Sequence, residues 1–166
     1  KTTNNIQNME WTKCPDFPVV AGTASLGVSA PLASIWNDLL VVAGGCNFPD
    51  KPVIKGGVKR YYNEVFTLNL QENGADWKMI GYLPEPVAYG ATAVTSRGIV
   101  CIGGNNSNTS FSEVFLLVPE KESFRMIVLP ALPVVMNNMA ASAMGDMIYV
   151  AGGNADGVPS NVFYSL

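Results

Sequence analysis

Leu39-Leu40-Val41-Val42-Ala43-Gly44-Gly45 is an apolar run closed by a pair of glycines, and the chain repeats this pattern twice. The two further copies are Ile99-Val100-Cys101-Ile102-Gly103-Gly104 and Ile148-Tyr149-Val150-Ala151-Gly152-Gly153. Each run is followed by a second short element, and these elements are Glu64-Val65-Phe66, Glu113-Val114-Phe115 and Asn161-Val162-Phe163. Short runs that are apolar at every position are typical of strands buried between two neighbouring sheets.

The spacing of the glycine pairs defines the length of the repeat. Gly103 precedes Gly152 by 49 residues, whereas Gly44 precedes Gly103 by 59. The extra residues fall between the first glycine pair and Glu64, so Cys46 to Asn63 is predicted to be an enlarged loop. A repeat of roughly 50 residues with several strands per unit predicts an all-β propeller. In that fold the loops at the rim carry function, and the core carries packing.

Each repeat is predicted to hold four strands, the fourth of which carries an aromatic residue, Trp77 or Phe124, expected to pack between blades. Glu64 and Glu113 are expected to accept backbone hydrogen bonds within their blades. The predicted divisions are a flexible N-terminus at 1–10, an orphan outer strand at 11–18, a first blade at 19–84 with its enlarged loop at 46–63, a second blade at 85–133 and a third at 134–166 that lacks its outer strand. The chain therefore holds about three four-stranded blades, half of a six-bladed ring.

The composition excludes several kinds of chemistry. The 166-residue chain has no histidine, which removes His metal ligands and His-dependent catalytic triads, and its three cysteines form no Cys-x-x-Cys pair. The net charge of −3 and the lack of a basic run argue against nucleic acid as a partner. No apolar run approaches the roughly 20 residues that cross a bilayer. We therefore expect no cofactor, no metal, no nucleic-acid partner and no membrane span.

The enlarged loop gathers positive charge and aromatic rings. Four of the ten basic residues lie in it, and its only acid is Asp50. The four are Lys51, Lys55, Lys59 and Arg60. This surface suits an anionic ligand such as a sugar carboxylate, which Arg60 is able to hold through two hydrogen bonds. Phe48, Tyr61 and Tyr62 offer faces for a pyranose ring. Strand alternation predicts that one of the two tyrosines points inward and the other outward, so at most one contacts the ligand. The alternative is a solvated basic loop whose tyrosines pack on the blade.

Strand parity places the loops that follow the glycine pairs on one rim, together with 84–89 and 17–28. Asn105 and Asn154 follow glycine pairs and serve either to form turns or to bind sugar hydroxyls. Glu85 is either an acid of the site or a solvated side chain. The predicted substrate-binding residues are Asn47, Phe48, Lys59, Arg60, Tyr61 and Asn105. No catalytic residue is assigned.

Glycine pairs after apolar strands, each with an aromatic residue further on, resemble the kelch repeat. The enlarged loop gives a narrower match, since Ala43-Gly44-Gly45-Cys46-Asn47-Phe48-Pro49 and Gly57-Val58-Lys59-Arg60-Tyr61-Tyr62 are similar to a blade of the bacterial sialic acid mutarotases, the N-acetylneuraminate epimerase family. Trp77 and Ala88-Tyr89-Gly90 extend the match. The early position of this blade resembles the cyclically permuted branch of the family. The resemblance implies a six-bladed kelch propeller, exported to the periplasm or the exterior, that interconverts the anomers of N-acetylneuraminate.

Two departures limit what the resemblance implies. The family places a key Glu and Arg in a rim loop that no loop of this chain matches, and six blades need about 300 residues. The expected function is therefore anomer interconversion of sialic acid or a related acidic sugar, with the catalytic Glu and Arg outside this chain. The alternative is a non-catalytic kelch module that binds a protein or a glycan, so whether the chain is an enzyme stays open. Exposed strand edges predict self-association or a partner that supplies the remaining propeller half.

Overall fold

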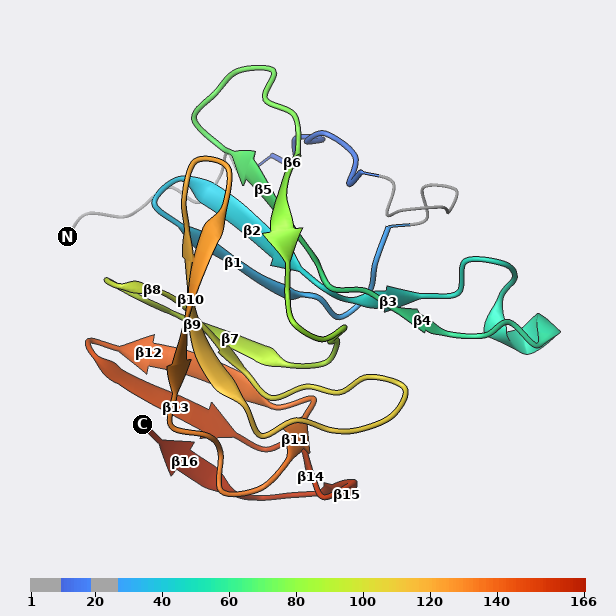
Figure 1. Ribbon diagram of the computed structural model, residues 1–166, viewed down its shortest axis with the longest axis vertical. Helices are drawn as coiled ribbons and strands as arrows, with labels where there is room; N and C mark the ends of the chain where they lie inside the picture. The colour runs from blue at the N-terminus through green and yellow to red at the C-terminus, as the bar shows by residue number, and fades with distance from the viewer. Residues whose placement is uncertain (1–9, 19–26) are drawn as a thin grey trace.

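The computed structural model describes residues 10–18 and 27–166, which fold as an all-β, kelch-type arrangement of small antiparallel sheets (Figure 1). Blade 1 consists of β1 (Leu32–Trp36), β2 (Leu39–Ala43), β5 (Glu64–Asn69) and β6 (Lys78–Tyr82). Blade 2 consists of β7 (Ala91–Thr95), β8 (Gly98–Ile102), β9 (Val114–Pro119) and β10 (Phe124–Leu129). Blade 3 has the three strands β12 (Ala140–Met144), β13 (Met147–Ala151) and β16 (Phe163–Ser165).

Shorter elements lie at the rim of the blades. They are β3 (Cys46–Asn47), β4 (Arg60–Tyr61), β11 (Met136–Asn137), β14 (Asn154–Ala155), β15 (Val158–Pro159) and the 3-10 turn η1 (Val53–Lys55). Within the described ranges no helix is long and apolar enough to span a membrane.

The inner strands of the three blades, β1, β7 and β12, lie side by side. The hydroxyl oxygens of Ser34 and Thr92 are 2.7 Å apart between β1 and β7. Trp36 Nε1 donates a hydrogen bond to the Thr95 carbonyl oxygen at 3.2 Å. Small side chains on β7, such as the buried Ala91 and Ala93, allow this close approach of the sheets. The blades therefore converge on one side, as they do around the axis of a propeller.

The hydrophobic core lies between the blades rather than inside any one of them. Ile99 and Cys101 of β8 pack with blade 1, whereas Val100 and Ile102, the alternate residues of β8, pack with blade 3. All four side chains are fully buried. The expectation that this run is apolar on both faces because sheets cover both faces is confirmed.

The glycine pairs are required by the packing of the following blade. Gly45 N donates to the Val87 carbonyl at 2.7 Å, and Gly104 N donates to the Met136 carbonyl at 2.8 Å. A Cβ on Gly44, whose φ is +67°, would lie 2.3 Å from the Val87 carbonyl oxygen. The same atom on Gly152 would meet nothing within 4 Å among the described residues. The glycine pair is therefore the point where one blade receives the backbone of the next.

One expectation for the outer strands needs correction. Residues 11–18 form no strand, because Pro15 and Pro18 lack the N–H that a ladder needs. Instead Phe17 packs edge-on against Phe66 and Trp77, with ring centroids 5.2 and 5.0 Å apart. Trp77 thus covers this segment, and no blade that precedes blade 1 is described against which its expected inter-blade packing could be judged.

The structure agrees with the expectations for Phe124, Glu64 and Glu113. Phe124 packs between blades as expected, directly over the backbone of Gly81. The Glu64 and Glu113 carboxylates each accept a backbone hydrogen bond, from Asn63 N at 3.2 Å and Ser112 N at 3.0 Å. Residues 1–9 of the flexible start expected at 1–10, and residues 19–26 at the beginning of the first blade, lie outside the described residues.

Candidate functional site

The rim is built on the same backbone motif in each blade. The residue after the glycine pair bonds with a residue just before the inner strand, as in Ser29 with Cys46, Ala88 with Asn105 and Asn137 with Asn154. The next residue of each blade has a positive φ, and these three are Ala30, Tyr89 and Asn138. Tyr89 N donates to the Ala30 carbonyl at 2.9 Å, and Asn138 N donates to the Tyr89 carbonyl at 2.7 Å. One chain of backbone hydrogen bonds therefore crosses all three blades and holds Tyr89 at its centre.

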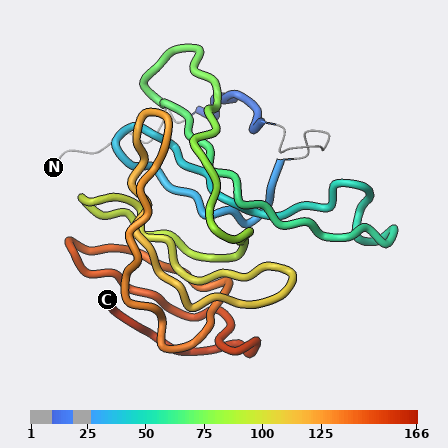
Figure 2. The backbone as a smooth tube through the Cα atoms, viewed as in Figure 1, coloured from blue at the N-terminus to red at the C-terminus, as the bar shows by residue number. Residues whose placement is uncertain are grey.

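The enlarged loop of blade 1, Cys46–Asn63, forms an arm that projects from this rim (Figure 1 and Figure 2). Its base is the antiparallel pair β3–β4, in which Cys46 faces Tyr61 and Asn47 faces Arg60. Beyond the pair the chain passes through η1, which ends at Gly56 with a φ of 76°. The arm is thus a short hairpin with a long, turned end.

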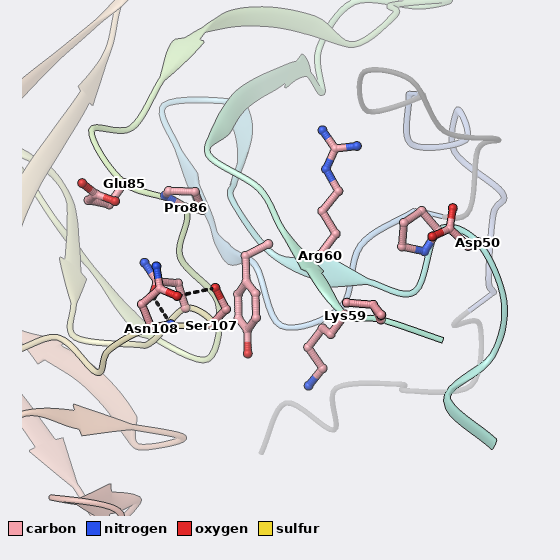
Figure 3. A pocket seen from close by; sticks show the side chains of 11 residues that line it. Asp50, Lys59, Arg60, Glu85, Pro86, Ser107 and Asn108 are labelled. Carbon is pink, nitrogen blue, oxygen red and sulfur yellow. Dashed lines mark hydrogen bonds between the residues drawn. The ribbon is translucent and has the colours of Figure 1, made fainter. Parts of the chain in front are cut away.

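A cavity of about 680 Å³ lies between the arm and the rim loops of blade 2 (Figure 3). The arm contributes Lys59, Arg60 and Tyr61 to its wall, together with Asp50. Loops of blade 2 contribute the residues opposite, which include Glu85, Pro86, Ser107 and Asn108. The cavity therefore brings the basic and aromatic part of the arm to face an acidic and amide-bearing wall.

Lys59 is enclosed by aromatic rings. Its Nζ lies 5.6, 6.0 and 5.0 Å from the ring centroids of Phe48, Tyr61 and Tyr89, which are within the range of cation–π attraction. The same Nζ donates a hydrogen bond of 2.9 Å to the Tyr89 hydroxyl oxygen. This hydrogen bond raises the pKa of Lys59 above its ordinary value of 10.5, against the opposing effect of burial. Lys59 is therefore a fixed positive charge at neutral pH.

Tyr89 joins the arm to blade 2. Its hydroxyl oxygen accepts a hydrogen bond from Lys59 and lies 3.5 Å from the Cys46 Sγ. The contact with Cys46 raises the pKa of Tyr89, while the contact with Lys59 opposes that rise. The phenol therefore keeps its proton at neutral pH. Cys101, by contrast, is a structural thiol, since burial raises its pKa to about 12.

Arg60 lies on the opposite side of β4 from Lys59, as strand alternation requires. Its side chain is exposed, and its Cζ is 5.2 Å from the ring centroid of Tyr62. Figure 3 shows the Arg60 guanidinium and the Lys59 amine pointing away from one another. Tyr62 is buried while Tyr61 lines the cavity, so the prediction that one of the two tyrosines faces inward is confirmed.

Asn47 holds the arm to its surroundings. Its Oδ1 accepts from the Tyr62 hydroxyl at 2.7 Å, and its Nδ2 donates to the Gly27 carbonyl at 2.8 Å. Both ends of the amide are thus engaged in contacts within the protein. Of the predicted ligand residues, Asn47 has the geometry of a support for the arm.

Asn105 sits at the base of the blade 2 loop. Its backbone exchanges hydrogen bonds with Ala88, and its Nδ2 donates to the Asn106 carbonyl at 3.3 Å. The Asn106 Oδ1 in turn accepts from Asn108 N at 2.8 Å and from Thr109 N at 3.1 Å. This geometry favours the turn-forming interpretation of these asparagines over sugar binding.

The structure places Phe48 and Tyr61 around Lys59 and adds Tyr89, which the predicted set omitted. Arg60 also lines the cavity, but its guanidinium points away from Lys59 and lies over Tyr62. Tyr89 lies in the Ala88-Tyr89-Gly90 stretch, and its register before an inner strand is the signal that points to it. In the part of the chain that the structure describes, no group of Asp, Glu, Cys or His residues is arranged to hold a metal ion.

The fold and this site define a section of a kelch-type β-propeller with a cationic, aromatic arm on its rim. A family model for N-acetylneuraminate epimerase matches residues 1–125, and the chain belongs to that family. It is 33% identical over 107 residues to N-acetylneuraminate epimerase of Haemophilus influenzae (strain 86-028NP), a match that covers 59% of this chain and 28% of the relative. It is 31% identical over 114 residues to N-acetylneuraminate epimerase of Brucella melitensis, covering 64% of this chain and 29% of the relative.

Among solved structures, the chain is similar to that described as the structure of YjhT, with a TM-score of 0.62 and 17% identity. The likeness covers 85% of this chain and 36% of that one, and it supports the kelch-type fold. The matched part of the chain thus spans between a quarter and two fifths of these similar proteins.

Proposed function

We propose that this protein binds N-acetylneuraminate or a related acidic sugar against the arm and takes part in the interconversion of its anomers. The observation that carries the proposal is the Lys59 ammonium, held between aromatic rings beside the cavity, in the segment that matches the epimerase family. Aromatic faces suit the apolar side of a pyranose ring, and a fixed cation suits a sugar carboxylate.

Anomer interconversion needs only one proton donor and one proton acceptor beside the sugar. One group donates a proton to the ring oxygen while another accepts the proton of the anomeric hydroxyl, the ring opens, and the reverse steps close it on either face. Neither step needs a metal or a nucleotide. The Glu and Arg that the family resemblance implies for this reaction have no counterpart in this chain, and we place them in the remaining part of the propeller.

Exchange spectroscopy by NMR tests the proposal. With N-acetylneuraminate in solution, we expect cross-peaks between the α and β anomers to grow faster when full-length protein is added than in buffer alone. Exchange rates equal to buffer would overturn the catalytic part of the proposal. Broadened sugar signals without faster exchange would favour the second candidate, a non-catalytic kelch module that binds a glycan, which the missing Glu and Arg loop supports.

We also propose that blade 3 is covered in the functional assembly. Three of its large apolar side chains, Met144, Met147 and Phe163, are strongly exposed, at 70%, 45% and 66%. Such faces drive association, either with a second copy or with the rest of the propeller. Light scattering of this chain is expected to give the mass of a dimer or a larger species. A single species with the mass of a monomer would contradict the proposal that blade 3 is covered. Export from the cytoplasm, taken from the family resemblance, is part of the same proposal and is tested by cell fractionation.

A further inference from the structure

Lys59 has no acidic partner within the described residues. The two ion pairs formed there are Lys13 with Asp16 and Arg125 with Glu120, both at exposed positions far from the arm. The Lys59 ammonium is instead held by three aromatic rings and one phenol oxygen. Aromatic faces attract a cation but leave its full charge in place. The arm thus fixes a positive charge that forms no ion pair within the described residues, with the Asp50 and Glu85 carboxylates lining the same cavity.

The hydrogen bonds of Lys59 and Tyr89 leave donors unused. An ammonium group has three N–H donors, and the contacts found for Lys59 use one of them, to the Tyr89 oxygen. The Tyr89 oxygen accepts from Lys59 and lies 3.5 Å from the Cys46 Sγ, which also lies 3.7 Å from the Ser29 carbonyl oxygen. A thiol has a single proton, so the Tyr89 O–H points to the sulfur when that proton is turned to Ser29, and is free to bind a ligand when the proton is turned to Tyr89. Two donors, one of them charged, lie side by side with their heavy atoms 2.9 Å apart.

The pair is also held in place before any ligand arrives. Tyr89 is fixed through its backbone by the hydrogen bonds to Ala30 and Asn138, and Lys59 is next to the paired strand β4. A preorganised pair of donors loses little conformational freedom on binding. Two adjacent donors match the two oxygens of one carboxylate, and charge-assisted hydrogen bonds of this kind are roughly twice as strong as neutral ones.

We infer that the Lys59 ammonium and the Tyr89 hydroxyl together bind the carboxylate of the sugar, with the Cys46 thiol holding the phenol in orientation. This inference rests on the proposed function for the identity of the sugar. It assigns the carboxylate to Lys59 and Tyr89 instead of Arg60, whose guanidinium stacks over Tyr62 on the other side of β4. It also orients the sugar, because the carboxylate is attached to the anomeric carbon of N-acetylneuraminate and so places the reacting centre beside Tyr89.

Calorimetric titration of three variants with N-acetylneuraminate tests this subsite. We expect Lys59→Met to weaken binding at least about tenfold and Tyr89→Phe to weaken it about three- to tenfold, through the loss of one hydrogen bond to a charged group. Lys55→Met is the matched control, since Lys55 is an exposed lysine of the same arm in η1, and we expect its affinity to stay within about twofold of wild type. The methyl ester of the sugar should bind wild type about as weakly as the acid binds Lys59→Met.

Two outcomes would overturn the inference while leaving the proposed function in place. One is binding of the sugar that Lys59→Met leaves unchanged, and the other is a loss of binding in Arg60→Met equal to or larger than that in Lys59→Met. Circular dichroism of each variant shows whether it is folded, and Lys59→Arg, which keeps the charge, should recover part of the affinity.

A second arm of the experiment separates the subsite from the sugar. Acetate is titrated into the protein while the side-chain NMR signals of Lys59 and Tyr89 are followed. If acetate moves both signals in wild type but moves Lys59 less in Tyr89→Phe, and the sugar does not bind, the carboxylate site stands and the proposed function fails. If acetate moves neither signal, the inference is overturned whatever the sugar does.

Discussion

The arm of blade 1 and the corresponding loop of blade 2 begin from the same base and end differently. In both blades the residue after the glycine pair bonds with the residue before the inner strand, Cys46 with Ser29 and Asn105 with Ala88. The blade 2 loop then closes on itself, since Asn106 N donates to the Thr109 carbonyl and Phe111 N to the Gly104 carbonyl. These backbone groups of the blade 2 loop are therefore used to form its own turn.

The arm instead reaches out of its own blade. Its longer chain carries Lys59 to the hydroxyl of Tyr89, a residue that precedes the first strand of blade 2. The repeated base therefore provides the scaffold in both blades, and the residues added to the blade 1 loop carry the groups proposed to bind the sugar. The contrast between a loop that satisfies itself and an arm that presents unused donors leads to four predictions.

The largest effect is expected where the base itself is changed. Gly44→Ala places a Cβ 2.3 Å from the Val87 carbonyl oxygen at a φ of +67°, and Gly103→Ala meets the Met136 carbonyl at 2.5 Å. We expect each to lower the free energy of unfolding by about 3 kcal/mol or more, as measured by urea denaturation. Gly152→Ala is the control, with the same φ but no neighbour within 4 Å, and should cost about 1 kcal/mol. An equal loss at Gly152 would show that another chain packs there.

The second prediction removes the arm and keeps its base. Asn47 and Arg60 face each other in β3 and β4, so replacing residues 48–59 with Asn-Gly closes a two-residue hairpin. The variant loses Phe48 and Lys59, and we expect sugar binding to fall at least about 100-fold. Because the core between the blades is untouched, the unfolding free energy should change by no more than about 1 kcal/mol. Retained binding in this variant would contradict the proposed site.

The third prediction compares cysteines in the two regions. Cys14 is exposed, Cys46 is buried at the base of the arm, and Cys101 is buried in the core strand β8 with its pKa raised to about 12. We expect a thiol reagent at pH 8 to label Cys14 at once, Cys46 slowly through opening of the arm, and Cys101 only with global unfolding. Mass spectrometry of the labelled peptides gives the order. Equal rates for Cys46 and Cys101 would mean that arm and blade open as one unit.

The smallest effect is expected from pH. The Tyr89 hydrogen bond raises the folded-state pKa of Lys59 above 10.5, so its contribution to stability is complete below pH 10.5 and is lost as the pH rises through the folded-state pKa. The raised pKa of Tyr89 acts in the same direction above pH 10.0. We expect urea unfolding to show that wild type and Lys59→Met differ by a constant amount up to about pH 10 and converge above it. A difference in unfolding free energy that grows with pH would contradict the raised pKa of Lys59.

The blades were predictable because they repeat. Three copies of one apolar run with glycine pairs define the strands, and the unequal spacing locates the arm without any structure. Strand alternation was enough to predict that Tyr61 and Tyr62 face opposite sides. These features depend on local periodicity, which a single sequence displays directly.

The details of the site depend on contacts between distant parts of the chain. Nothing in the sequence shows that Lys59 meets the Tyr89 hydroxyl or that Arg60 turns to Tyr62, because both follow from how the arm folds back over the rim. The absent strand at 11–18 has a local cause, since two prolines stand in it, yet the aromatic spacing there resembled an outer strand. Which side chains meet across the rim can therefore be learned only from the three-dimensional structure.

The most direct test of the central claim is an NMR titration of the assigned protein with N-acetylneuraminate. If the arm is the binding element, chemical shifts should move most at Phe48, Lys59, Tyr61 and Tyr89, and less at the residues of 105–110 that line the opposite wall of the cavity. Shifts confined to the asparagine-rich loop of blade 2, or no shifts at millimolar sugar, would contradict it.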